Sequence, residues 1–170
     1  MYKVDDYLIF GKDVCKVKGV EEKKYNDEDY YILAPIKDET LKLEIPVSST
    51  KIRDLITEDD LNNLIERIPS IETIQTEDKF IESEYKRLLS SGNEEDLIKV
   101  IKTTYLRNEE RVNNKKRKGE KDSIYFKEAE EALYSQVSVI KNIPLEDAKE
   151  YFINKIKELT NKKEDFDKVP

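Results

Sequence analysis

Basic side chains gather in one short stretch of this sequence, residues 107–121, and binding of phosphate groups is the chemistry that their spacing allows. The stretch contains seven basic residues: Arg107, Arg111, Lys115, Lys116, Arg117, Lys118 and Lys121. Because only three acids accompany them, the stretch carries a charge of +4, and the rest of a chain whose net charge is −7 carries −11. An acidic protein with one cationic segment meets a polyanion through that segment, so these residues are a candidate nucleic-acid contact.

The four consecutive cations Lys115, Lys116, Arg117 and Lys118 decide which kind of contact to expect. Lysine and arginine neutralise phosphates here without reading base edges, so binding would be sensitive to salt and only weakly sequence-specific. A solvated loop between two helices is the other interpretation of a lysine-rich stretch, and the sequence leaves both open.

The composition argues against catalysis. The chain has no histidine, which excludes histidine-dependent triads and zinc sites that use imidazole. Its single cysteine, Cys15, lies in an alternating apolar run, where a buried small hydrophobic residue is the expected role, and it leaves no partner for an intrachain disulfide. No glycine-rich phosphate loop is present, and the carboxylates are scattered along helix faces. We therefore expect no enzymatic activity, no cofactor and no metal.

A second candidate site is a short predicted strand before residue 57, in which apolar and charged residues alternate. Its residues are Leu41, Lys42, Leu43, Glu44, Ile45 and Pro46. The alternation predicts that Leu41, Leu43 and Ile45 face inward while Lys42 and Glu44 face outward, and that Pro46 interrupts the ladder. Such an edge can accept a strand from another protein, although a protected edge without a partner has the same sequence pattern.

The apolar residues recur with period two before residue 57 and with helical spacing after it, so we predict an α+β chain. Strands are expected over residues 2–10, 14–24, 29–36 and 40–47, with a short fifth near Ile52, separated by turn residues. A sheet of sequential antiparallel strands in residues 1–55 is expected to curl into a small Tudor- or SH3-like barrel, which removes exposed edges.

The second part, residues 57–162, is predicted to be a compact bundle of about five helices, followed by a polar tail at 163–170. The expected helices are one from a cap at Thr57 to Pro69, one over residues 77–90, one capped by Asn93, one capped by Ser123 and one after Pro144. Tyr85, Tyr105 and Tyr134 lie on the apolar stripes of these helices and are interpreted as core residues.

The order of several short motifs resembles the CarD/CdnL family of transcription regulators. In the first part they are YKVDDYLIFG at 2–11, VCKV at 14–17, DYYIL at 29–33 and IPV at 45–47. In the second part they are SG at 91–92, IKVI at 98–101, YLR at 105–107, KGEK at 118–121 and AEEALY at 129–134. Each motif is modest, but together they cover nearly the whole chain in the family's order.

The resemblance implies that residues 1–55 form a Tudor-like domain that binds the β subunit of bacterial RNA polymerase through the strand at 41–46. It also implies that the helical part contacts promoter DNA at the upstream edge of the transcription bubble, through the basic residues of 107–121. Many members carry a tryptophan that wedges into the minor groove, and Gln75 stands at about that position here. Glutamine can form hydrogen bonds in the groove but supplies no apolar wedge.

The resulting expectation is a divergent regulator that modulates the stability of the open promoter complex. We expect a monomer that is cytoplasmic, joins the nucleoid through polymerase and has no membrane contact, because the chain has no long apolar run and no signal-like start. A protein–protein adaptor that binds polymerase or another strand-accepting partner without DNA is the alternative.

Overall fold

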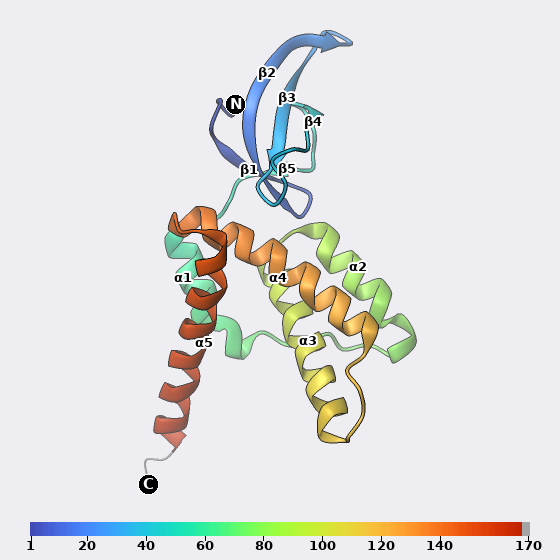
Figure 1. Cartoon of the computed structure of the whole chain (residues 1–170), viewed down its shortest axis with the longest axis vertical. Helices are drawn as coiled ribbons and strands as arrows, with labels where there is room; N and C mark the ends of the chain where they lie inside the picture. The colour runs from blue at the N-terminus through green and yellow to red at the C-terminus, as the bar shows by residue number, and fades with distance from the viewer. Residues whose placement is uncertain (168–170) are drawn as a thin grey trace.

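The structure is a computed structural model that describes the backbone of residues 1–167 and the side chains of residues 1–155 and 158. A β-sheet lies at one end of the molecule and a group of helices at the other (Figure 1). The strands are β1 (Tyr7–Phe10), β2 (Asp13–Tyr25), β3 (Glu28–Pro35), β4 (Leu43–Pro46) and β5 (Ile52–Arg53). The helices are α1 (Glu58–Arg67), α2 (Ile81–Ser91), α3 (Glu94–Asn113), α4 (Glu120–Lys141) and α5 (Leu145–Asp167), with short 3₁₀ turns η1 (Ile68–Ser70) and η2 (Asp78–Phe80).

The five strands form one antiparallel sheet in the order β4-β3-β2-β1-β5. Turn chemistry explains the two hairpins. Gly11 has φ +62 in the turn between β1 and β2, while Asn26 and Asp27 both have positive φ between β2 and β3, as a tight hairpin turn requires. The register of β2 against β3 shifts between Val17 and Gly19, and β2 is visibly curved (Figure 1). The predicted α+β class and meander are confirmed.

Closure of the sheet into a barrel is not confirmed, because within the described residues β4 and β5 are the two outer strands and do not pair with each other. The first strand is also shorter than the predicted 2–10. The amide of Lys3 donates to the Asp6 carboxylate over 2.8 Å, and Asp5 has φ 75, so the chain turns before it enters β1. The predicted strand 40–47 is reduced to β4, which leaves Leu41 before the strand and 48% exposed instead of facing inward.

Side-chain caps begin α1 and α3, whereas α2 and α4 begin without one. Thr57 caps α1 by accepting from the Asp60 amide over 3.1 Å, and Asn93 caps α3 by accepting from the Glu95 amide over 2.9 Å, both as predicted. The predicted cap Ser123 is wrong, because α4 begins at Glu120 after Gly119. The Gly119 amide instead donates to Asn108 of α3 over 2.8 Å, which fixes the start of the helix from outside.

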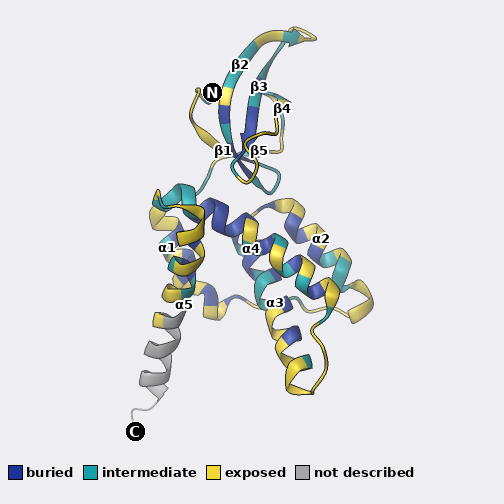
Figure 2. Ribbon diagram, viewed as in Figure 1, coloured by how far each residue is buried: buried dark blue, intermediate teal, exposed yellow. Residues whose placement is uncertain are grey.

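Each part of the chain has its own hydrophobic core (Figure 2). The core of the sheet contains Leu8, Cys15, Val17, Tyr31 and Leu33. Cys15 is fully buried, and burial raises the pKa of its thiol to about 12, so the prediction of a small hydrophobic residue is confirmed. The core of the helices is centred on the facing sides of α2, α3 and α4. In place of the predicted polar tail from residue 163, α5 continues to Asp167, while residues 168–170 lie outside the described part.

The sheet and the helices meet at the end of α2. Arg53 of β5 donates to the Gly92 carbonyl and, from Nη1, to the Glu94 carboxylate over 3.0 Å. The Glu94 side chain is only 6% exposed. Gly92 has φ +63, and a Cβ atom at this position would collide with the backbone carbonyl of Gly11. The two parts therefore touch backbone to backbone, and a second contact joins Lys12 and Glu128 at 3.6 Å.

We expect Gly92→Ala to lower the free energy of unfolding by about 2–4 kcal/mol, because alanine adds left-handed backbone strain and a clash with the sheet. Gly11→Ala is the matched control: Gly11 has φ +62 but open space around its Cβ position, so only the strain of about 1 kcal/mol applies. Urea denaturation followed by circular dichroism measures both values. Equal losses for the two variants would contradict the close contact.

Candidate nucleic-acid and protein interfaces

The four consecutive cations, hereafter the basic loop (Lys115, Lys116, Arg117 and Lys118), connect α3 to α4 at the end of the helical part away from the sheet (Figure 1). Two backbone hydrogen bonds close the end of α3 beneath the loop. The Lys115 amide donates to Val112 over 3.0 Å and the Lys116 amide to Arg111 over 2.7 Å, with Lys115 at φ 59. All four side chains are exposed, and none forms an ion pair with another described residue. The loop thus offers its positive charge to solvent.

A buried carboxylate holds the base of this loop. Asp122 is 3% exposed and lies in the first turn of α4, where negative charge is favoured by the helix dipole. Its side chain accepts hydrogen bonds from Tyr85 (2.7 Å), Arg107 (3.2 Å) and Arg111. Burial alone raises the pKa of Asp122, but these hydrogen bonds outweigh it and hold the pKa below its usual value. Burial and the bond to Asp122 raise the pKa of Tyr85 well above its ordinary value, so Tyr85 stays a donor.

The structure therefore divides the seven predicted phosphate contacts into two groups. Arg107 also pairs with Asp78 at 2.9 Å, Arg111 is held by Asp122, and Lys121 pairs with Glu82 at 2.9 Å. These three residues make intramolecular ion pairs that join the segment before α2, α2 itself and α3 to the start of α4. Only the four residues of the basic loop are left with unpaired charge among the seven.

Asn108, which the sequence analysis does not predict as a site residue, holds the two ends of the basic loop together. Its Oδ1 accepts from the Gly119 amide at 2.8 Å and from Arg111 at 3.2 Å, and its Nδ2 donates to Ser123 at 3.3 Å. The side chain is 8% exposed. The signal that could have identified it is its spacing: Asn108 follows the partly buried Ile101 by seven residues, so a polar residue stands on a core-facing side of α3.

Gln75 lies in the segment between η1 and η2 and is exposed. Its Nε2 donates to the Thr73 carbonyl (3.3 Å) and to the Thr73 hydroxyl (3.0 Å). The preceding amide, that of Ile74, donates to Thr103 of α3 over 2.9 Å, so the segment is anchored on the helix that leads to the basic loop. The side-chain amide of Gln75 can be approached from solvent, as a minor-groove contact would require.

The predicted edge strand is an edge in the structure. β4 pairs with β3 on one side only, in a register that places Leu43 opposite Leu33 and Ile45 opposite Tyr31. Leu43 and Ile45 pack on the core of the sheet, while Lys42 and Glu44 are exposed as predicted. Pro46 ends the strand opposite Tyr30.

Charge is neutralised locally on this edge. Glu44 accepts from Lys24 of β2 at 2.7 Å and lies 3.4 Å from Lys42. The hydrogen bond from Lys24 holds the pKa of Glu44 below its usual value. Lys24 also pairs with Glu21, so two acids balance the two lysines here. Among the described residues no strand pairs with the outer side of β4, and such a free edge is what strand addition uses.

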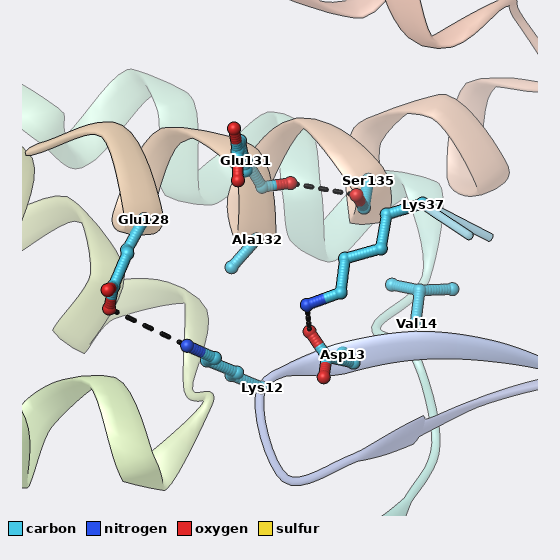
Figure 3. Close-up of a pocket in the computed structure, with 8 residues that line it drawn as sticks. All are labelled: Lys12, Asp13, Val14, Lys37, Glu128, Glu131, Ala132 and Ser135. Carbon is cyan, nitrogen blue, oxygen red and sulfur yellow. Dashed lines mark hydrogen bonds and ion pairs between the residues drawn. The ribbon is translucent and has the colours of Figure 1, made fainter. Parts of the chain in front are cut away.

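A small cavity between the sheet and α4 is too small to be a ligand site. It measures about 30 Å³ and lies between the turn after β1 and the middle of α4 (Figure 3). Its polar groups are paired with one another: Lys37 lies 2.9 Å from Asp13, and Ser135 donates to the Glu131 carbonyl over 2.7 Å. Ligand pockets are about ten times larger, so this cavity is a packing gap at the junction.

Comparisons with known proteins give no family: no protein-family model matches the chain, and no curated protein matches it. Among the described residues, no cluster of three or more acidic or cysteine side chains could hold a metal ion. None of the described helices combines the length and apolar character needed to cross a bilayer.

Replacing Asp122 with asparagine is expected to destabilise the protein by about 2–3 kcal/mol at neutral pH, because it leaves the partly buried Arg111 without an acid and Arg107 with Asp78 alone. The folded-state pKa of Asp122 is depressed, so its contribution is fully present above the unfolded-state pKa of about 3.9 and is lost as pH falls through the folded-state value. Urea titrations should show a constant difference from wild type between neutral and mildly acidic pH, and a shrinking difference below about pH 4. A difference that persists undiminished in acid would contradict the ion-pair role.

Proposed function

We propose that this chain is a transcription regulator of the CarD/CdnL type, which binds the RNA polymerase β subunit through β4 and promoter DNA through the basic loop. The observation that carries the proposal is the exposed, unpaired positive charge of Lys115, Lys116, Arg117 and Lys118 on an otherwise acidic chain. Phosphate contact through such a loop is sequence-independent, which suits a factor that polymerase delivers to many promoters.

The sheet supports the first half of the proposal. A five-stranded antiparallel meander whose fifth strand returns beside the first, with a sharply curved second strand, is compatible with a Tudor-like module. The free edge of β4 is available for strand addition by polymerase. We propose that the protein acts as a monomer in the cytoplasm, joins the nucleoid through polymerase and performs no catalysis.

The proposed mechanism is thermodynamic. A regulator that holds polymerase by one end and DNA by the other shifts the promoter toward the open complex only by its differential affinity for the open and closed states. Gln75, on a segment anchored to α3, would face the minor groove near the bubble and supply hydrogen bonds in place of an apolar wedge.

The second candidate function is an adaptor that binds polymerase, or another strand-accepting partner, without DNA. The observation in its favour is the pairing of Arg107, Arg111 and Lys121 within the protein, which reduces the charge offered to a polyanion. DNA binding by the isolated protein distinguishes the two functions.

Changing all four residues of the basic loop to alanine should weaken binding to promoter DNA and reduce the slope of log affinity against log salt by about 3.6, since each of the four lost phosphate contacts removes about 0.9. Fluorescence anisotropy over a salt titration measures both quantities. The control replaces Lys3, Lys18, Lys149 and Lys155, which are exposed and outside the loop, so that net charge changes equally. An unchanged slope in the loop variant would favour the adaptor.

Glu44→Lys should weaken binding to the isolated β subunit about fivefold or more, because three cations, Lys24, Lys42 and the new lysine, would then repel one another on the docking edge. Glu39→Lys, an exposed position before β4, provides the same charge change away from the strand. Surface plasmon resonance on immobilised β subunit gives the affinities. Equal behaviour of the two variants would remove β4 from the interface.

A further inference from the structure

A groove runs between α3 and α4 directly beside the basic loop. It has a volume of about 490 Å³, and its walls include Tyr105 and Val112 of α3, Phe126 of α4 and Lys118 of the basic loop. A volume of this size lies in the range of pockets that hold small organic molecules, and it is large enough for a nucleoside. Because Lys118 belongs to the wall, the groove and the cationic loop form one continuous surface.

Two large side chains in this groove, one aromatic and one apolar, are exposed to solvent instead of packing in the core. Tyr105 is 51% exposed and Val112 is 48% exposed, although the sequence predicts a core position for Tyr105. The two residues are seven positions apart and therefore lie on the same flank of α3. Arg107 and Arg111 point to Asp122 instead, so one flank of α3 binds the start of α4 while the other lines the groove.

Tyr105 differs from the other tyrosines of the helices. Tyr85 and Tyr134 are buried, and their hydroxyls donate to Asp122 and Glu130 inside or beside the core. The hydroxyl of Tyr105 donates to Glu109, four residues later on the same helix, over 3.0 Å. This hydrogen bond raises the pKa of Tyr105 and ties its ring to the helix surface at the groove. The ring is thus held in place while about half of the side chain faces solvent.

We propose that this groove binds unpaired nucleobases of a single nucleic-acid strand whose phosphates contact the basic loop. Proteins that bind single strands combine a cationic track for the backbone with aromatic side chains on which bases stack. The exposed cations select a polyanion over a neutral or basic peptide. The walls combine the rings of Tyr105 and Phe126 with polar side chains such as Asn113, which suits bases that are not already stacked in a duplex. The inference rests on the proposed function, and it assigns the melted strand, in addition to duplex phosphates, to this end of the molecule.

The test compares binding of the full-length protein to a short fluorescent single strand and to a duplex of the same sequence, by anisotropy at constant salt. Tyr105→Ala should weaken single-strand binding about fivefold or more and leave duplex binding unchanged, because it removes the stacking surface but no cation. Tyr105→Phe retains the ring and should bind both oligonucleotides as the wild type does. Tyr25→Ala, which removes a similarly exposed tyrosine from the sheet hairpin, should also have no effect.

Val112→Glu provides a second variant at an exposed wall position and should weaken single-strand binding as well. Wild-type single-strand affinity in both Tyr105→Ala and Val112→Glu would overturn the inference while leaving duplex binding, and the proposed function, intact. Loss of polymerase binding in these variants with unchanged affinity for both oligonucleotides would also overturn it and make the groove a protein contact. The alanine variant of the basic loop reports separately on the proposed function, since it should weaken binding to both oligonucleotides.

Discussion

The neutralisation of one buried carboxylate organises the helical half of this protein. A charge as deeply buried as that of Asp122 is tolerated only when hydrogen-bond donors surround it, and here Tyr85, Arg107 and Arg111 supply them from α2 and α3. The same contacts hold α2 and α3 against the first turn of α4. They also pair two of the seven cations of residues 107–121 inside the protein. Most of the remaining accessible positive charge of this stretch therefore lies in the basic loop. Internal electrostatics thereby shapes the external surface.

The sequence predicts well where local rules decide the structure. The switch from strands to helices, the hairpin turns and the caps Thr57 and Asn93 all follow from turn and capping chemistry. The alternating pattern and Pro46 predict an edge strand at β4, and among the described strands β4 pairs with β3 alone. Closure of the sheet could not be predicted, since it depends on whether the outer strands meet, and β5 has only two residues.

The sequence predicts poorly where a side chain finds its partner on another helix. The sequence predicts that the seven cations of residues 107–121 are equivalent, because the order of charges along the chain does not reveal that Asp122 faces Arg107 and Arg111. Tyr105 has the spacing of a core residue, yet α4 does not cover the flank of α3 on which it lies. The start of α4 differs from the prediction for a similar reason: Asn108, eleven residues earlier, accepts a hydrogen bond from the amide of Gly119, the residue before the helix. Tertiary contacts override propensity at these positions.

The contact between Gly11 and Gly92 helps to set the distance between the free edge of β4 and the basic loop. The free edge of β4 and the basic loop belong to different halves, and at Gly11 and Gly92 the two halves meet backbone to backbone. A methyl group at position 92 would act as a spacer that changes the angle between them. The separation between the sheet edge and the loop therefore depends on a residue that belongs to neither surface.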